Sequence, residues 1–137
     1  MAVVRVAVAV VLVGNQVLLA KRPLDKNQGG LWEFPGGKIE AEESPQAALV
    51  RELQEEVGVD FSCANITPLI TLPFTYPEVE VHLEVFTLDA HESALKQAYG
   101  AENQEIRWVS ISELENYEFP KANVAILEAL KDRAVSK

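Results

Sequence analysis

The amino-acid sequence predicts an α/β protein in which helices cover both faces of a mixed β-sheet. Apolar, β-branched segments alternate along the chain with two long helical segments, at residues 45–57 and near residues 122–133. Strands interleaved with helices in this way are typical of an α/β/α sandwich. The 137 residues are enough for a substantial core, so we expect a single domain over residues 1–137.

The chain is acidic, with 21 Asp and Glu residues against 12 Lys and Arg, a net charge of −9. This balance disfavours binding to duplex nucleic acid, which normally needs a basic surface. A free nucleotide stays open as a partner, because metal ions can supply positive charge locally. The apolar start is too short to span a bilayer and lacks signal-peptide features, and Cys63 is the only cysteine. We therefore expect a cytoplasmic protein with no membrane partner.

The first elements form a predicted hairpin. Residues 3–13 are almost wholly apolar and β-branched, which indicates a buried central strand. Gly14-Asn15 is typical of a two-residue turn, and residues 16–21 are expected to be the returning strand. The polar residues 23–30 indicate a mobile loop, and residues 31–34 a short strand that ends at Pro35.

A Gly-rich turn, Gly36-Gly37, leads toward the helix at residues 45–57. Ser44-Pro45 is a strong start signal, because Ser caps free N–H groups and Pro suits the first helical position. Gly58 predicts the end, since glycine enters the left-handed conformation without a Cβ clash. One apolar stripe at helical spacing is expected to face the core: Leu49, Val50, Leu53 and Val57.

The same helix carries three glutamates, Glu52, Glu55 and Glu56, at spacing i, i+3, i+4 on a second face. Their mutual repulsion costs roughly 0.2–0.5 kcal/mol per like-charged pair. A solvated acidic face is the ordinary interpretation of such a pattern. The alternative is a metal site, because hard oxygen ligands suit Mg²⁺ or Mn²⁺. Mg²⁺ in proteins commonly bridges carboxylates to substrate phosphates, so a nucleotide or another diphosphate would be the natural partner.

The second half of the chain predicts two paired strands, at residues 66–76 and 79–88. Residues 89–104 form a long connection, and long loops in compact domains are often functional. A strand at residues 106–109 follows, and Ser112 to Glu115 has the pattern of a capping box that opens a short helix. The last helix is expected to face the core through four residues: Val124, Ile126, Leu127 and Leu130.

Fixed spacings in the helical region identify a family resemblance. Five residues separate Gly37 from Glu43, and seven separate Glu43 from the run RELQEEVGV at residues 51–59. This pattern matches the Nudix box at every defined position, so the chain resembles a Nudix hydrolase. The stretch LWEFPGGKIE at residues 31–40 and FPKAN at residues 119–123 are similar to the MutT-type branch of that family.

The resemblance implies a Nudix fold with a curved mixed sheet and metal-assisted hydrolysis of a phosphoanhydride. MutT-type enzymes convert 8-oxo-dGTP to the monophosphate and pyrophosphate with Mg²⁺, Mn²⁺ being possible. The implied metal ligands are the Gly36 carbonyl, Glu52, Glu55, Glu56 and Glu102. Glu52 is the first choice for the catalytic base and Glu102 the second, while Glu105 competes with Glu102 for the loop position.

The resemblance also implies a nucleotide pocket. Its substrate-binding residues would be Arg22, Glu33, Phe34, Pro35, Gly36, Tyr76 and Asn123, with Asn123 reading the base. Structural roles fall to Gly37, Glu43 and Arg51. We expect an ion pair between Arg51 and Glu43 that ties the Gly-rich loop to the helix, with Arg51 away from the three-glutamate face.

Three other functions remain open. A Nudix pyrophosphohydrolase could act on modified pyrimidine nucleoside triphosphates or on another nucleoside diphosphate derivative. A non-catalytic module could instead recognise a damaged base, although such modules usually lose the box carboxylates that this chain keeps. For the MutT-type enzyme we expect a monomer that binds a small nucleoside triphosphate rather than nucleic acid.

Overall fold

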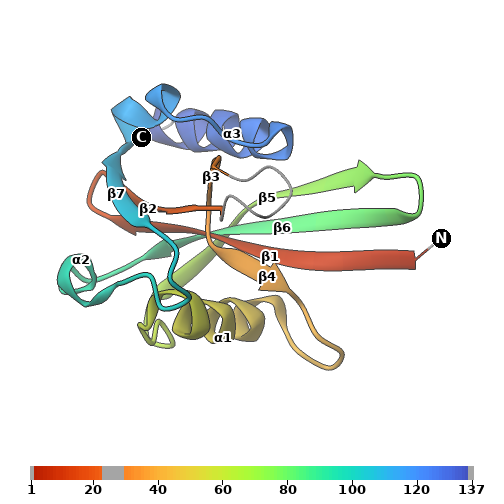
Figure 1. The fold of residues 1–137 in the computed structure, drawn as a ribbon, viewed down its shortest axis with the longest axis horizontal. Helices are drawn as coiled ribbons and strands as arrows, with labels where there is room; N and C mark the ends of the chain where they lie inside the picture. Colours follow the sequence, from red (N-terminus) through yellow and green to blue (C-terminus); the bar gives the residue numbers. More distant parts are fainter. Residues whose placement is uncertain (1, 23–29, 136–137) are drawn as a thin grey trace.

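The structure, a computed structural model, describes residues 2–22 and 30–135, the last three by their backbone alone. The loop expected at residues 23–30 lies outside the described residues except for Gly30. In the described part, helices pack on both faces of a mixed sheet (Figure 1). The elements in chain order are β1 (Ala2–Val13), β2 (Gln16–Lys21), β3 (Trp32–Glu33), β4 (Gly36–Lys38), α1 (Pro45–Val57), β5 (Asn65–Thr75), β6 (Val79–Asp89), α2 (Ala94–Gln97), β7 (Ile106–Ser110), η1 (Ile111–Asn116), η2 (Lys121–Asn123) and α3 (Val124–Val135).

The sheet is organised around β1. One edge of β1 pairs in parallel with β6 over its whole length, from Ala2 opposite Val79 to Leu12 opposite Asp89. The other edge pairs antiparallel with two strands, with β4 near the middle of β1 and with β2 at its end. The strand order is β3-β2-β1-β6-β5, and β7 pairs with β2. The prediction of a central first strand is therefore confirmed.

Alternate residues of β1 contribute to two separate cores. Ala7, Ala9 and Val11 belong to the core beneath α1. Val8, Val10 and Leu12 belong to the core on the opposite face, beneath α3. A strand buried on both faces reads as a continuous apolar run, which is why this segment lacks polar alternation. The predicted α/β/α sandwich is confirmed.

Helix α1 begins and ends where its local signals predict. The Ser44 hydroxyl accepts a hydrogen bond from the Ala47 N–H at 3.1 Å, and Gly58 takes the left-handed conformation with φ of 73°. The buried side is Ala48, Leu49, Leu53 and Val57. Val50 was expected in this stripe but is half-exposed, and Ala48 lies in the core instead.

Three local predictions are wrong in detail. Gly36-Gly37 is not a turn but part of β4, because its backbone pairs with β1. The connection at residues 89–104 contains the short helix α2. The Ser112 pattern does not act as a cap: the 3₁₀ helix η1 already begins at Ile111 and has no side-chain cap.

The final helix also differs from its prediction. A 3₁₀ turn, η2, precedes it, so α3 begins at Val124. Ile126 and Leu130 are buried as expected, whereas Val124 is 47% exposed. Val124 occupies the first position of the helix, where the chain has only just reached the sheet.

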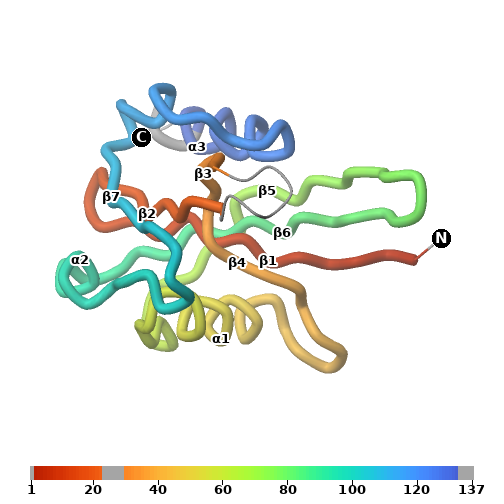
Figure 2. Tube along the Cα trace, viewed as in Figure 1, coloured from red at the N-terminus to blue at the C-terminus, as the bar shows by residue number. Residues whose placement is uncertain are grey.

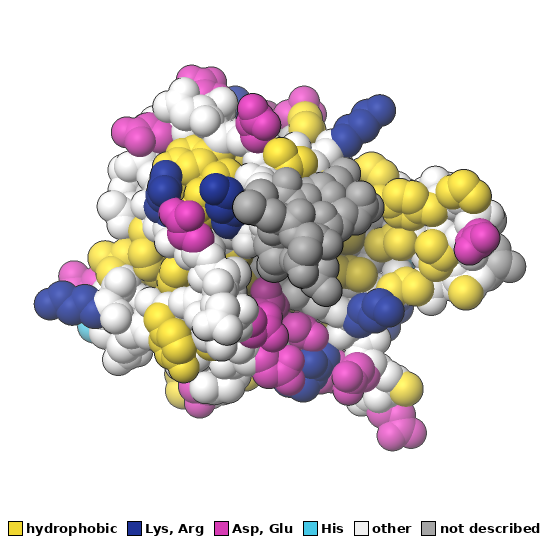
Figure 3. All heavy atoms as spheres, in the orientation of Figure 1, with side chains coloured by type: hydrophobic (Ala, Val, Ile, Leu, Met, Phe, Trp, Pro, Cys, Tyr) yellow, Lys and Arg dark blue, Asp and Glu magenta, His cyan; other side chains and the backbone are white. Residues whose placement is uncertain are grey.

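The hairpin of β5 and β6 extends beyond the helices, alongside the start of β1 (Figure 2). Apolar side chains are visible over this extension on the face shown in Figure 3. Pro68 and Pro73 lie in β5, an edge strand, where a missing N–H costs the sheet little. Among the described residues, no helix is long and apolar enough to cross a membrane.

Candidate active site

The three glutamates of α1 lie in different surroundings. The Glu55 side chain is 54% exposed and that of Glu52 is 18% exposed. Glu56 points inward, and its Oε2 atom is buried with no hydrogen-bond partner among the residues that the structure describes. Burial, followed by the nearby charges of Glu52, Glu102 and Glu33, raises the pKa of Glu56 to about 8, although a hydrogen bond from the Gly36 backbone opposes the rise. Four carboxylates therefore share one electrostatic environment.

The glycines of β4 allow the backbone to approach this environment closely. A Cβ atom on Gly37 would overlap the Glu52 carboxylate, and one on Gly36 would overlap the Ala7 carbonyl of β1. A side chain at Gly36 would push β4 away from β1, and one at Gly37 would displace the Glu52 carboxylate. Two consecutive glycines thus let a sheet strand lie directly against the acidic face of a helix.

Arg51 connects the segment after β4 with this face. Its guanidinium donates two hydrogen bonds to Glu43, at 2.8 and 3.0 Å, and one to the Lys38 carbonyl at 3.0 Å. The expected ion pair with Glu43 is therefore present, and it lowers the pKa of Glu43 to about 2. Arg51 was expected to lie away from the glutamate face, and this is wrong. It donates to Glu52 Oε1 at 2.9 Å and lies 3.6 Å from Glu55 Oε2, because residues four apart on a helix are neighbours on its surface.

The loop before β7 is fastened to the end of α1. The Tyr99 N–H donates to the Val57 carbonyl at 3.1 Å, and the Ala101 N–H donates to the Glu56 carbonyl at 2.9 Å. These contacts bring the exposed Glu102 near enough to raise the pKa of Glu56. Its rival Glu105 instead pairs with Arg107 at 2.7 Å. The structure therefore favours Glu102 as the loop carboxylate of the site.

The donor set fits a divalent metal ion. A buried carboxylate oxygen without a partner, beside other carboxylates, is the kind of ligand that Mg²⁺ or Mn²⁺ satisfies. Within the described residues, however, no three His, Cys, Asp or Glu side chains form a ready-made metal cage. Arg51 neutralises Glu52 and Glu55 in this arrangement, and repulsion favours separation of the remaining carboxylates.

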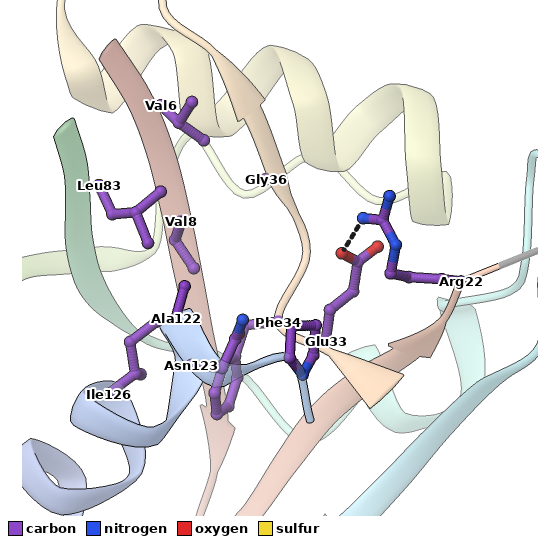
Figure 4. A pocket seen from close by; sticks show the side chains of 11 residues that line it. Val6, Val8, Arg22, Glu33, Phe34, Gly36, Leu83, Ala122, Asn123 and Ile126 are labelled. Carbon is purple, nitrogen blue, oxygen red and sulfur yellow. Dashed lines mark hydrogen bonds and ion pairs between the residues drawn. The ribbon is translucent and has the colours of Figure 1, made fainter. Parts of the chain in front are cut away.

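A cavity of about 300 Å³ adjoins the acidic face at Gly36 (Figure 4). Arg22 and Glu33 form an ion pair of 2.8 Å on one side of it. Phe34 stacks on Phe119, with ring centroids 5.5 Å apart, and supplies an aromatic wall. Of the predicted substrate-binding residues, the cavity brings together Arg22, Glu33, Phe34, Gly36 and Asn123.

Two predicted substrate-binding residues do not line this cavity. Tyr76 lies at the end of β5 and is 49% exposed, because the hairpin extends away from the helices. Pro35 is buried, and its carbonyl accepts a hydrogen bond from the Ala9 N–H. The lining residues that the sequence analysis missed are Val6, Val8, Leu83, Pro120, Ala122 and Ile126. Val6 and Val8 on β1 and Leu83 on β6 lie on the same face of the sheet as Val10. The alternation of side chains along a strand could have revealed this.

Comparison with known proteins agrees with this arrangement. The chain matches the NUDIX domain family over residues 7–129. It is 41% identical over 87 residues to an 8-oxo-dGTP diphosphatase of Proteus vulgaris, covering 64% of this chain and 76% of that protein. A CTP pyrophosphohydrolase of Escherichia coli K12 is 35% identical over 132 residues, covering 94% of this chain and 92% of that protein. The solution structure of the E. coli ORF135 protein has a TM-score of 0.84 at 31% identity and covers 100% of this chain and 94% of that one.

The fold, the glutamate-bearing helix and the glycine strand beside it define a hydrolase of phosphoanhydride bonds. The chain belongs to the Nudix family. Within that family it resembles the MutT-type 8-oxo-dGTP diphosphatases, as its sequence motifs predict.

Proposed function

We propose that this protein is a Mg²⁺-dependent pyrophosphohydrolase that converts 8-oxo-dGTP to 8-oxo-dGMP and pyrophosphate. The observation that carries the proposal is the position of Gly36. Gly36 lines the cavity of about 300 Å³, and its backbone is hydrogen-bonded to Glu56. A nucleotide whose base lies in the cavity would therefore have its phosphates directed along β4 toward the acidic face.

Asn123 supports an oxidised purine as the base. Guanine presents two acceptors, O6 and N7, on its major-groove edge, and oxidation at C8 places a proton on N7. The edge then carries one acceptor and one donor. An Asn amide offers one NH₂ group and one carbonyl, so it can pair with both atoms. If the base were unoxidised guanine, the carbonyl of Asn123 would face the lone pair of N7, and two acceptors would oppose each other.

The residues around the phosphates divide the chemistry among them. Glu52, Glu55, Glu56, Glu102 and the Gly36 carbonyl would hold Mg²⁺, which neutralises phosphate charge and orients the attacking water when bound. Glu52 accepts the proton of that water, with Glu102 as the alternative base. Arg51 keeps the Glu52 carboxylate oriented through its 2.9 Å hydrogen bond. Arg22 and Glu33 line the cavity beside Gly36 as an ion pair, where they would contact the bound nucleotide.

A second candidate is hydrolysis of a pyrimidine nucleoside triphosphate. It is favoured by the CTP pyrophosphohydrolase relative, whose similarity extends over 94% of this chain. An Asn amide can also pair with the donor and acceptor edge of a cytosine. The cavity residues named above would then bind a smaller base against the same Phe34 wall.

A substrate panel separates the two candidates. Values of kcat/KM are measured with Mg²⁺ for 8-oxo-dGTP, dGTP, CTP, dCTP and 5-methyl-dCTP, and pyrophosphate release is recorded. We expect 8-oxo-dGTP to rank first. A pyrimidine triphosphate in first place would replace the primary proposal by the second. Full turnover in excess chelator would refute the metal requirement for both.

A further inference from the structure

Gln104 joins the two parts of the chain that carry the candidate metal ligands. Its Nε2 donates to the Glu56 carbonyl at 2.8 Å, and its Oε1 accepts from the Glu102 N–H at 2.9 Å. One side-chain amide therefore bridges the backbone of a helix glutamate and that of a loop glutamate. These glutamates are far apart in the sequence, and nothing in the box motif involves Gln104.

Each bond of this bridge meets a structural need. Glu56 is the last residue but one of α1, so its carbonyl has no partner within the helix. Gln104 and Ala101 both donate to it. On the loop side, the Glu102 N–H lies in a turn where a backbone donor needs an acceptor, and Gln104 supplies one.

The turn itself is tightly folded over Gln104. The Asn103 N–H donates to the Gly100 carbonyl at 3.1 Å, and Asn103 has a φ of 64°. A Cβ atom on Gly100 would overlap the Gln104 carbonyl. The position of the Glu102 backbone is thus set by contacts of the loop with itself and with the end of α1, and Gln104 takes part in both.

We propose that Gln104 is a positioning residue that holds the Glu102 carboxylate toward Glu56, so that loop and helix ligands can close on one metal ion. The inference rests on the proposed function. It depends on the amide group, because only an amide both donates and accepts at this length. Residues that hydrogen-bond to metal ligands typically contribute about 10–100-fold to metal affinity or activity.

The test compares Gln104→Met with wild type and with the control Gln97→Met. Methionine keeps the length of the side chain and removes both hydrogen bonds, and Gln97 is an exposed glutamine of α2. In metal-free protein, exchange of the Glu102 amide hydrogen is followed by NMR. We expect exchange about tenfold faster in Gln104→Met and unchanged in Gln97→Met. The affinity for Mn²⁺ alone, measured by EPR, should fall about 10-fold, and kcat should fall while KM changes less than threefold.

A double-mutant cycle decides whether Gln104 acts through Glu102. In a Glu102→Gln background, Gln104→Met should weaken Mn²⁺ binding by less than twofold. Independent effects of the two substitutions would overturn the proposal, and so would wild-type Mn²⁺ affinity in Gln104→Met, even with a lowered Tm. If Gln104→Met fails to fold, Gln104→Lys replaces it, since it keeps a donor for the Glu56 carbonyl and loses the acceptor for the Glu102 N–H; exchange of the Glu102 amide should again be about tenfold faster, and wild-type exchange would overturn the proposal. A wild type that binds Mn²⁺ but hydrolyses no nucleotide would refute the proposed function alone, since exchange and Mn²⁺ affinity still test Gln104.

Discussion

Three carboxylates within one helical turn differ because each meets a different neighbour. Glu55 faces solvent, Glu52 lies between Gly37 and Arg51, and Glu56 is turned into the protein. A buried carboxylate without a partner is costly, and its pKa rises in response. A divalent cation bound beside Glu56 would offset this cost, in agreement with the metal site proposed above.

The choice of catalytic base gives the first prediction. Glu52→Gln should lower kcat by about 10²–10⁴-fold, the usual cost of removing a general base, with substrate binding largely kept. Rates are measured at saturating substrate and Mg²⁺, with Glu115→Gln on η1 as an exposed control. If Glu52→Gln retains near-normal kcat and Glu102→Gln does not, the base is Glu102.

Asn123 carries the second prediction. Asn123→Ala should lose activity on 8-oxo-dGTP, and its preference for 8-oxo-dGTP over dGTP should fall by about 5- to 150-fold. This range corresponds to the cost of a mispaired buried polar group, roughly 1–3 kcal/mol. The measurement is the ratio of kcat/KM for the two nucleotides, with Asn65→Ala on the exposed edge of β5 as the control. An unchanged ratio would show that another group reads the base.

The sequence predicts individual site residues unevenly. The shared face of Glu52, Glu55 and Glu56 follows from helical spacing, a local property, whereas their assignment to a site depended on the resemblance to the Nudix box. The burial of Glu56 could not be predicted, because it depends on β4 lying across the helix. Tyr76 was expected to be an apolar wall of the pocket, yet it follows the far end of β5 and is 49% exposed. Gln104 was missed because its two partners lie on different elements.

At the scale of elements, the site is a contact between α1 and β4. Helix α1 was predictable because Ser44, Pro45 and Gly58 act within one turn of its ends. Strand β4 was not, because its pairing partner, β1, lies about thirty residues earlier and glycines signal a turn more often than a strand. The glycine pair permits the close approach, and Arg51 holds the segment between the two elements in place.

Removing this connection gives the third prediction. Arg51→Ala should lower both Tm and kcat/KM, because residues 38–43 lose their attachment to α1 and Glu52 loses its orienting donor. Thermal unfolding and turnover are measured beside Arg5→Ala, which breaks the bidentate pair between Arg5 and Glu84 on the sheet surface. The Arg5 side chain is 48% exposed, and exposed ion pairs contribute little to stability. Lost turnover with an unchanged Tm would instead assign Arg51 a direct catalytic role.

The same ion pair predicts a response to acid. Hydrogen bonds from Arg51 hold the pKa of Glu43 at about 2, below its ordinary value of 4.5. A carboxylate whose pKa is lower in the folded protein than in the unfolded chain stabilises the folded state when the pH is above the ordinary pKa. This stabilisation is lost as pH falls from 4.5 toward 2. Between these values, the Tm of Arg51→Ala should therefore fall less steeply than that of wild type. Parallel curves would show that the pair contributes nothing to stability.

At the scale of the whole molecule, the acidic site belongs to a protein with a net charge of −9, which repels other anions. Acidic side chains gather over α1 and the segment before it on the face shown in Figure 3. A triphosphate approaching this face without a cation would be repelled. This charge distribution favours cations over anions at this face, and its effect on stability can be measured by varying pH.

The last prediction follows from Glu56, whose pKa is raised to about 8 from an ordinary 4.5. Between these values the folded protein binds a proton that the unfolded chain releases, so stability falls as pH rises toward 8. In excess chelator, Tm should therefore decrease from pH 5 to pH 9. Glu56→Gln should flatten the curve, because its amide does not ionise. At pH 8 to 9, Mg²⁺ should raise the Tm of wild type more than that of Glu56→Gln, since a ligand that binds only the folded state stabilises it. Equal slopes in chelator would mean that Glu56 is ionised throughout this range, and the buried oxygen would then need another partner.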